Sequence, residues 1–395
     1  MTSMALLFVA LVGLASSTVY VALAAAAAVR FRARTMVSLA AAKSGSPVPV
    51  TVLKPLHGSE PQLEACLESF FRQEYQSFEI IFGARDSDDK AWDVVDTLER
   101  RYPHVKSRRI VCGEPVYPNA KVSALETMVA HASFRHIVIA DSDARVPPDC
   151  LTRVVGPLAD PDVGLVTCLY RGVPTGGLCS RLEALGMSVE MPSGVLVADM
   201  LEGMRFALGP TVATRTDVLR LIGGIRALGP YCADDYVLGH LTHAAGMTVV
   251  LSDQVIDHLA LNRSFRASMQ HQIRWMRSTR FSRPWGHLGT ALTFAMPFGI
   301  LGLASAGAGG HWMLGVGLAC WAIANRVIQS LMVGWLALRD REACRWAWLY
   351  PVRDLLGFCV WCGSFIGTHI VWRGEQYELS SGGRMRRQSR EVSAL

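Results

Sequence analysis

Two carboxylates at the end of an apolar run are the clearest candidates for chemistry in this chain. Residues 137–140 are apolar, and Asp141 and Asp143 follow directly. Such a run favours a strand buried on both faces of a parallel sheet, which delivers its last residues to the edge where α/β proteins bind ligands. Two acids one residue apart can hold a hard divalent cation and present it to a diphosphate. The alternative is a solvated turn, because Asp-Ser-Asp is also common turn chemistry.

Three other segments combine residue types that could act together with this pair. Two are acidic and follow or precede predicted elements, and one is a late cationic and aromatic segment. They are Asp88-Asp89, Asp234-Asp235 and His271-Gln-Ile-Arg274-Trp275.

Alternating strands and helices should position these loops. A parallel sheet with right-handed crossovers is predicted, which would gather the acidic loops at one edge. No G-x-G-x-x-G follows the first strand, which argues against dinucleotide binding. The predicted strands cover residues 48–53, 78–83, 107–112, 136–140, 163–169 and 247–251, and the predicted helices cover 61–76, 91–102, 121–132, 148–158, 217–222 and 237–245.

The composition is too apolar for an ordinary soluble enzyme. The 395 residues are 51% hydrophobic, with a mean hydropathy of +0.26. Membrane segments plus one sizeable domain are therefore expected. The net charge is only +6, and the basic clusters flank apolar stretches, which favours anionic lipid headgroups over nucleic acid as their partners. The ten cysteines are scattered, as in proteins that keep reduced thiols.

Four apolar runs are long enough to span a bilayer. The first covers residues 4–29 and is followed at once by Arg30, Arg32 and Arg34, which predicts an uncleaved anchor with its downstream side in the cytoplasm. Three late runs cover 288–308, 311–338 and 348–371. Four spans would leave the tail outside, whereas its arginines favour the cytoplasm, and the sequence leaves this conflict open.

The chain therefore divides into five predicted parts. Residues 265–285 mix arginines with large apolar side chains, which is typical of a helix on the membrane surface. The parts are a membrane anchor over 1–34, a catalytic domain over 47–260, an interfacial helix over 261–286, membrane helices over 287–372 and a basic tail over 373–395.

The ordered set of motifs resembles the GT-A glycosyltransferases of the processive-synthase clan, most closely the ceramide glucosyltransferases and their bacterial relatives. Bacterial glycosyltransferases of hopanoid synthesis are also similar, through residues 165–171 and His271. The motifs that carry the resemblance over most of the chain are Leu53-Lys-Pro-Leu-His-Gly58, Arg85-Asp-Ser-Asp-Asp89, Pro118-Asn-Ala-Lys121, Asp141-Ser142 with Arg145-Val146, Gly223-Gly224, Asp234-Asp-Tyr236, Arg274-Trp275, and Trp372-Arg-Gly374 with Tyr377 and Gly382-Gly383.

The resemblance implies an α/β, Rossmann-like GT-A domain facing the cytoplasm, with one N-terminal and about three C-terminal transmembrane helices. It implies an inverting transferase that moves a hexose from UDP-glucose to the hydroxyl of a membrane lipid such as ceramide, with Mn²⁺ or Mg²⁺ as cofactor. The alternatives are a hopanoid polyol acceptor with UDP-N-acetylglucosamine as donor, a processive polysaccharide synthase, and a non-catalytic nucleotide-sugar binder.

On the donor side, the resemblance assigns Asp141 to the metal, with Asp143 as a second candidate ligand at a position where the family often has another residue. Asp89 would lie on the uracil–ribose side, with a capping or turn acid as the alternative. Lys121 would approach the nucleotide, unless it only begins a solvated helix.

On the acceptor side, Asp235 matches the general base of the family. Arg274 and Trp275 would lie near the departing diphosphate and the acceptor, unless they are only a pair at the membrane surface. His271 departs from the family's Gln or Arg, and we expect it to tune catalysis.

A groove for the lipid is expected beside these residues. Residues 194–201 form an apolar stretch that is too short to span, and the groove is assigned to Val195, Leu196, Met200 and the nearby Met204. They would border a groove that opens to the membrane, with Trp275 at its inner end, unless they fill the core of the domain.

Overall fold

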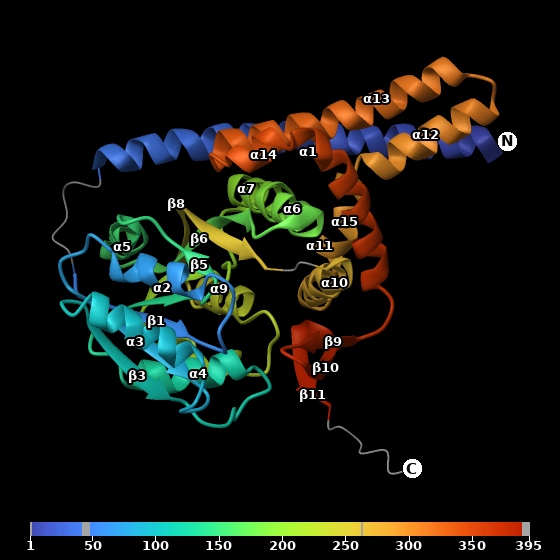
Figure 1. Cartoon of the computed structure of the whole chain (residues 1–395). Coiled ribbons are helices and arrows are strands. Elements are labelled where there is room, and N and C mark those ends of the chain that lie inside the picture. The colour runs from blue at the N-terminus through green and yellow to red at the C-terminus, as the bar shows by residue number, and fades with distance from the viewer. Residues whose placement is uncertain (1, 42–47, 262–263, 389–395) are drawn as a thin grey trace, which may run out of the picture.

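A layer of long apolar helices lies over one α/β domain in the computed structural model of the chain (Figure 1), which describes residues 2–41, 48–261 and 264–388. The C-terminal part of helix α1 (Thr2–Ala41) runs along the top of the domain, while its N-terminal part projects beyond the domain beside α12 (Met296–Ala308) and α13 (Trp312–Gln329). Residues 42–47, which include the start of the predicted catalytic domain, lie outside the described residues, as do the last seven residues of the predicted tail.

The first half of the sheet follows the predicted pattern. An eight-stranded sheet has the order β3-β2-β1-β4-β7-β6-β8-β5, and its first four strands are parallel. β1 is buried along its whole length, as its run of apolar residues predicts. The elements are β1 (Val50–Pro55), α2 (Leu63–Phe71), β2 (Phe78–Ala84), α3 (Ala91–Arg101), β3 (Lys106–Val111), α4 (Ala120–Ala130) and β4 (His136–Ala140).

In the second half, the prediction of a wholly parallel sheet is wrong. β7 pairs antiparallel with both β4 and β6, while β6 and β8 are parallel. Two consecutive strands that pair antiparallel need a connection that begins and ends at the same end of the strands. The helical segment 177–202 is this connection between β6 and β7. The elements are β5 (Ala144–Arg145), α5 (Cys150–Val155), β6 (Val163–Pro174), α6 (Gly177–Leu185), α7 (Met191–Glu202), β7 (Thr211–Arg215), α8 (Thr216–Leu221), α9 (Asp234–Ala244) and β8 (Thr248–Ala260).

Within the described residues, three helices are long and apolar enough to cross a membrane: Ser3–Met36, Gly177–Glu202 and Trp312–Ala337. A pair bent by 51°, Pro284–Thr293 and Met296–Ala308, could form a fourth. The run 348–371 is divided between α15 (Tyr350–Ser364) and a strand, so its helix is shorter than the sequence indicates.

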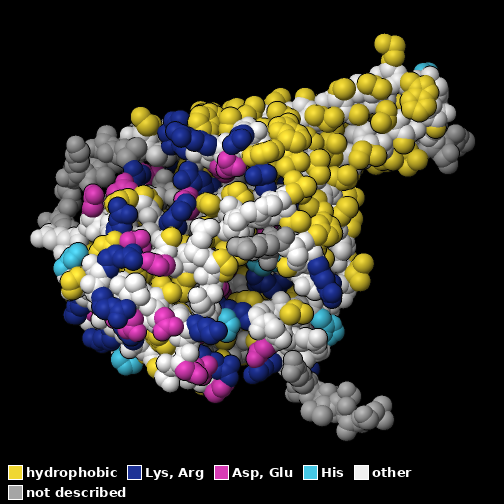
Figure 2. Space-filling model, in the orientation of Figure 1, with side chains coloured by type: hydrophobic (Ala, Val, Ile, Leu, Met, Phe, Trp, Pro, Cys, Tyr) yellow, Lys and Arg dark blue, Asp and Glu magenta, His cyan; other side chains and the backbone are white. Residues whose placement is uncertain are grey.

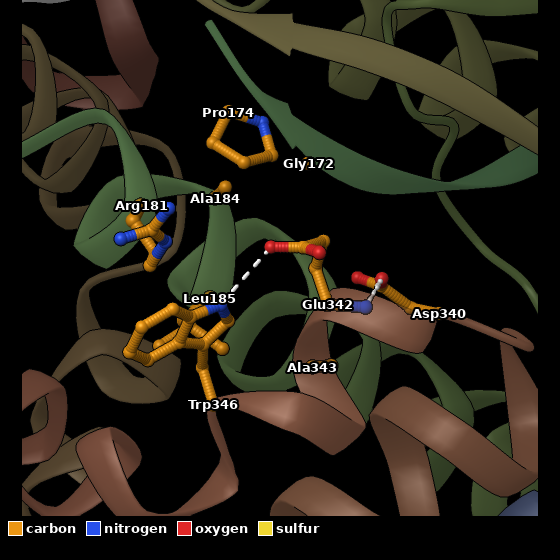
Figure 3. Close-up of a pocket in the computed structure, with 9 residues that line it drawn as sticks. All are labelled: Gly172, Pro174, Arg181, Ala184, Leu185, Asp340, Glu342, Ala343 and Trp346. Carbon is orange, nitrogen blue, oxygen red and sulfur yellow. Dashed lines mark hydrogen bonds between the residues drawn. The ribbon is translucent and has the colours of Figure 1, made fainter. Parts of the chain in front are cut away.

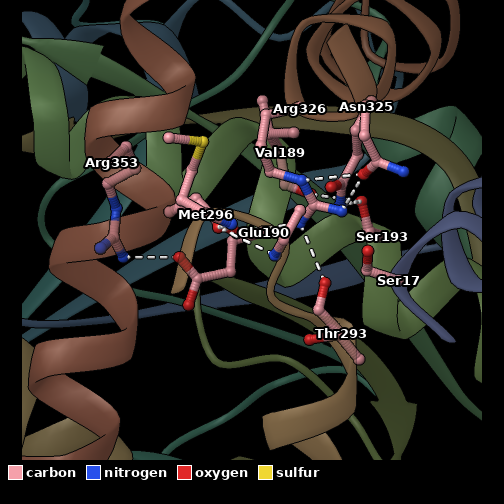
Figure 4. A network of polar contacts seen from close by, with 12 residues as sticks. Ser17, Val189, Glu190, Ser193, Thr293, Met296, Asn325, Arg326 and Arg353 are labelled. Carbon is pink, nitrogen blue, oxygen red and sulfur yellow. Dashed lines mark hydrogen bonds and ion pairs between the residues drawn. The ribbon is translucent and has the colours of Figure 1, made fainter. Parts of the chain in front are cut away.

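A buried ion pair explains the bend before α12. The Asp354 carboxylate accepts hydrogen bonds from the backbone N–H groups of Ala295 (3.1 Å) and Met296 (2.8 Å), and so caps the helix. Arg326 of α13 lies 2.9 Å from Asp354 and also donates to the Thr293 carbonyl (Figure 4). Both charged side chains are almost fully buried. Removing one partner would therefore leave an isolated charge among apolar helices.

A short helix, α14 (Arg341–Arg345), fastens the membrane layer to α6 (Figure 3). The Trp346 indole donates to Glu342 at 3.1 Å, and the Arg181 guanidinium lies 4.1 Å from the Trp346 ring centre. The space between these groups has no room for a water molecule, so they form a packing contact.

The described part of the predicted basic tail folds into a small sheet together with residues that precede it. β9 (His369–Trp372), β10 (Glu375–Ser380) and β11 (Arg384–Arg387) pair antiparallel. The sheet docks on the loop before α9, through hydrogen bonds from Cys232 N to Gly383 O (3.1 Å) and from Met385 N to Pro230 O (2.8 Å). The tail folds because its edge finds backbone partners in this distant loop.

The predicted helix over 265–285 is confirmed as α10 (Phe265–Ser282). Its arginines bind the chain itself: Arg280 donates to the carbonyls of Ser364 (2.6 Å) and Gly367 (3.0 Å), and Arg277 donates to Ile366 and His369. Arg277 and Arg280 therefore hold residues 364–369, which lead into β9. Their positive charges were expected to contact lipid headgroups.

The predicted lipid groove is wrong for three of its four residues. Val195, Leu196 and Met204 are no more than 5% exposed and belong to the main core, and only Met200 is partly exposed. The stretch is one part of the long helix Gly177–Glu202, which lies between α1 and the sheet, as Figure 1 shows. Its apolar side chains are therefore covered on two sides.

Candidate active site

The site forms where the parallel and antiparallel halves of the sheet meet. Asp141 follows β4, and its backbone N–H donates to Pro210 O at 3.1 Å, just before β7. Asp234 and Asp235 begin α9. Residues almost a hundred positions apart in the sequence are thus brought to one edge, as the sequence predicts.

Lys121 links the two halves of the site. Its Nζ lies 2.7 Å from Asp141 Oδ1 and 3.4 Å from Asp234 Oδ2. Asn119 caps α4 and places the lysine, because its side chain accepts from Val122 N and donates to Asp234 Oδ1 at 3.2 Å. Although burial acts to lower the pKa of Lys121, the charges of Asp141 and Asp234 raise it. The alternative of a solvated helix start is therefore wrong.

Gly209 keeps the carboxylates of Asp141 and Asp235 close together. A methyl group on Gly209 would lie 3.1 Å from Asp235 Oδ2 and 3.5 Å from Asp141 Oδ2. Burial, and then the negative charge of Asp234, raise the pKa of Asp235 to about 6. A carboxylate with a raised pKa is a better proton acceptor than an ordinary aspartate, provided it is ionised at the working pH.

Asp143 points from the same loop toward β8. Its Oδ1 is buried, lies 3.4 Å from His258 Nε2 and accepts no hydrogen bond from the described residues. A buried carboxylate oxygen without a partner is costly, and a cation would satisfy it.

These donors fit a divalent cation that takes its remaining ligands from a diphosphate. Among the described residues, no three His, Cys, Asp or Glu side chains form a ready-made metal site. Mg²⁺ is commonly held by one or two carboxylates together with substrate phosphates. The orphaned Asp143 Oδ1 and the Asp141 oxygen that faces Gly209 provide such a pair.

Asp89 joins two loops at the same edge of the sheet. Both of its oxygens accept from Gly58 N, at 2.9 and 3.0 Å, and Oδ1 also accepts from Ala91 N at 2.8 Å. The carboxylate therefore ties the end of β1 to the start of α3. This is the capping alternative, and it leaves the proposed uracil contact as a prediction.

His271 and Trp275 face the site from α10. The two rings are 4.3 Å apart, and the indole lies 6.4 Å from the ring of His258. The buried Glu183 of α6 orients the histidine, since His271 Nδ1 lies 2.7 Å from Glu183 Oε1, and it also accepts from Ser268 at 2.6 Å. Trp275 thus connects to the metal-side residues through His258.

Arg274 turns toward the tail sheet. Its guanidinium lies 5.4 Å from the ring centre of Trp372 in β9. Burial lowers the pKa of Arg274, so an anion at this position would stabilise its charge.

A family comparison decides what kind of protein this is. The model of glycosyl transferase family 21 matches residues 6–385. The chain belongs to this family. It is a hexosyltransferase with a GT-A fold, as the resemblance implied.

The chain is also similar to named relatives and to a solved structure. The family-21 chain is 25% identical over 352 residues to ceramide glucosyltransferase 1 of Caenorhabditis elegans, covering 85% of this chain and 73% of that protein. It is 23% identical to ceramide glucosyltransferase 3 of the same organism, over 85% of this chain and 74% of that one. A mannosyltransferase from Pyrobaculum calidifontis, solved with GDP-Man and Mn²⁺, is 20% identical, with 87% and 98% of the two chains covered and a TM-score of 0.46.

Sequence reasoning missed a buried lysine of this family-21 transferase. Lys54 is fully buried in β1, and its Nζ donates to the backbone carbonyl of Asp141. Burial lowers the pKa of Lys54 to about 8. A lysine in an otherwise apolar strand was the available signal, because a buried lysine is rare unless it is paired.

Glu60 and Gly209 were also missed. Glu60 accepts from Ser142 Oγ at 2.9 Å, and burial raises the pKa of its carboxyl. Gly209 gave no signal, because its role depends on the approach of two carboxylates from distant segments.

Proposed function

We propose that this protein transfers glucose from UDP-glucose to the hydroxyl of a ceramide-like membrane lipid, with inversion at the anomeric carbon. The observation that carries the proposal is the carboxylate cluster of Asp141, Asp234 and Asp235 around Lys121, in a domain packed under apolar helices. The relatives named ceramide glucosyltransferase support the choice of sugar and acceptor.

The donor would bind at the edge formed by Asp141 and Asp143, which would hold the divalent cation. Bound there, the cation would neutralise charge that develops on the departing diphosphate. Lys121 pairs with the Asp141 carboxylate and orients it, and Lys54 fixes the backbone of the same loop. Arg274 would offer its fork of donors to the phosphates.

Asp235 would act as the general base. Its carboxylate takes the proton of the acceptor hydroxyl while that oxygen forms a bond to the anomeric carbon. The bond between that carbon and the diphosphate oxygen breaks, and its electron pair leaves with UDP. Attack from the face opposite to the leaving group inverts the configuration. Trp275 would wall the acceptor side of the pocket.

The catalytic domain is proposed to face the cytoplasm, where nucleotide sugars are made. The arginines that follow the apolar run of α1 support this orientation. Cysteine labelling from each side of intact vesicles tests it. The reagent should reach Cys112, a half-buried cysteine of the catalytic domain, only from the cytoplasmic side.

A donor and acceptor panel tests the proposal directly. The purified chain is incubated with UDP-glucose, UDP-galactose or UDP-N-acetylglucosamine, each with ceramide or a hopanoid polyol, and the lipids are analysed by mass spectrometry. Glucosylceramide should be the main product. A glycosylated hopanoid would replace the proposed acceptor, while UDP binding without any product would identify a non-catalytic binder. A polymer would indicate a processive synthase.

A further inference from the structure

We propose that a cavity under the membrane layer binds the phosphate-bearing headgroup of an anionic phospholipid. The cavity has a volume of about 680 Å³ and lies between the end of α1, helix α2, the loop after β5, and the residues that follow the span Trp312–Ala337. Volumes of this order are typical of small-molecule sites. Asp141, Asp235 and Lys121 do not line it, so it is separate from the proposed active site.

Two candidate spans end at this cavity. Arg32 and Thr35 lie in the last turns of the span Ser3–Met36, and Leu338 and Arg339 follow the end of the span Trp312–Ala337. Residues just beyond an apolar span lie at the level of the lipid headgroups. In Figure 2, Lys and Arg side chains gather directly beneath the yellow helix layer. The cavity is therefore at the depth where a headgroup, with its glycerol and first acyl carbons, would enter.

The charges around the cavity are not balanced. Its lining contains six arginines and four carboxylates. Three of the arginines are paired: Arg145 and Arg171 with Asp257 (2.9 and 2.6 Å), and Arg153 with Asp253 (2.9 Å).

The other three arginines of the lining are Arg32, Arg72 and Arg339. Within the described part of the chain, their side chains have no hydrogen bond or ion pair. Arg32 and Arg339 are close enough to repel each other. An anion between unpaired guanidinium groups would remove that repulsion and form charge-assisted hydrogen bonds.

The position of Arg339 is built into the fold. Its φ of 56° is in the left-handed region, which a non-glycine residue adopts at a cost. Arg171 stabilises this conformation by donating to the carbonyls of Arg339 (3.2 Å) and Leu338 (3.4 Å), and Asp257 in turn holds Arg171. The backbone of Arg339 is thus held at the cavity, which Arg32 also lines.

Lipid binding to the full-length protein tests the inference without relying on transfer activity. The protein is reconstituted in vesicles of phosphatidylcholine with a minority of fluorescent phosphatidylglycerol, and binding is measured by energy transfer from tryptophan. Loss of all three charges in Arg32→Gln/Arg72→Gln/Arg339→Gln should weaken binding by about 100-fold, at roughly 1 kcal/mol for each cation near a membrane surface. Native mass spectrometry should show one fewer retained phosphatidylglycerol.

Arg34→Gln is the matched control. Arg34 lies one turn or less from Arg32 on the same helix, is paired with Asp199 at 2.7 Å and does not line the cavity. It should bind phosphatidylglycerol like the wild type. An equal loss in this control, or no loss in the triple variant, would overturn the proposal.

A single-residue variant and two soluble competitors complete the experiment. If the triple variant does not fold, the single variant Arg72→Gln replaces it, because Arg72 is exposed at the end of α2 and should still lose about fivefold in affinity. Inorganic phosphate and glycerol phosphate are added as soluble competitors. Displacement of the lipid by low concentrations of either would mean that the cavity is a water-facing anion site, and the lipid proposal would be wrong. UDP binding serves as the folding check in each case.

Discussion

The two halves of the catalytic sheet differ in what determines their structure. In the first half, β1 to β4 are parallel, and β1, β2 and β3 are each followed by a helix. In the second half, β7 runs antiparallel between β4 and β6, and the connection before it packs against α1. The first half therefore follows its local sequence pattern, whereas the second half includes a connecting segment that packs against the membrane layer.

The candidate site lies where these halves meet, at the seam formed by the paired strands β4 and β7. The first half contributes Lys54, Lys121 and Asp141, and the second contributes Gly209 and Asp235. We expect the first half to control the donor and the second half to control proton transfer. Substitutions on either side of the seam test this division.

The largest effect is expected for Asp235→Asn. Loss of the proposed base should reduce kcat by about 10³-fold, because an amide cannot accept the proton of the acceptor. The affinity for UDP-glucose, measured by calorimetry, should stay within about twofold, since the donor would be held by the other half. A collapse of donor affinity would instead make Asp235 part of the donor site and would remove the proposed division.

Asp141→Asn should act on the donor side. Removing one carboxylate of the proposed metal pair should lower activity by about 10²-fold and weaken UDP binding in the presence of Mn²⁺. In the wild type, EDTA should weaken UDP binding in the same way, and in the variant it should have little further effect. Full activity of the wild type in excess EDTA would contradict the assignment.

Leu196→Ala tests the connection that distinguishes the second half. Leu196 is 1% exposed in the core between α1 and the sheet, so truncation should cost about 2–5 kcal/mol of stability. The melting temperature should fall while the KM for lipid stays unchanged. Met200→Ala, at a partly exposed position of the same helix, is the control and should cost less.

These comparisons show how much the sequence could predict. The strands 78–83 and 136–140 and the helix 91–102 agree closely with β2, β4 and α3, because each has a complete local pattern. Asp141 and Asp143 were found from their place after a strand, whereas Asp234 and Asp235 were found from the family motif. The antiparallel β7, the folded tail and the burial of Val195 were not found, since each depends on a partner far away in the sequence.

Lys54 and Gly209 were missed for the same reason, because their roles depend on partners far away in the sequence. Lys54 binds the Asp141 backbone across the sheet, and Gly209 matters only because Asp141 and Asp235 approach it from two sides. Neither fact is visible in a local window of sequence.

The fall in rate at acid pH, the acid limb of the pH–rate profile, should follow the pKa of Asp235, which depends on the neighbouring charges of Asp234 and Lys121. Asp235 accepts a proton only when ionised, so with a pKa of about 6 the rate should fall about tenfold for each pH unit below that value. Asp234 raises this pKa and Lys121 lowers it. Asp234→Asn should therefore move the limb to lower pH, and Lys121→Met should move it to higher pH. Shifts in the same direction in both variants would rule out Asp235 as the group that titrates.

The smallest effect is expected at His271, where the second half meets α10. The ring lies against Trp275, and its Nδ1 is held by the buried Glu183. A glutamine at this position can still donate a hydrogen bond to Glu183, whereas alanine cannot. His271→Gln should therefore lose no more than about threefold in kcat/KM, while His271→Ala should lose about tenfold or more because a buried carboxylate loses a partner.

The control for this pair is the pH dependence. If His271 only positions Trp275, the His271→Gln variant should keep the wild-type acid limb, which belongs to Asp235. Equal losses in both variants would mean that the imidazole itself is needed. A shifted acid limb in His271→Gln would mean that its titration takes part in the reaction, so that proton transfer is shared between α9 and α10 and is not confined to Asp235.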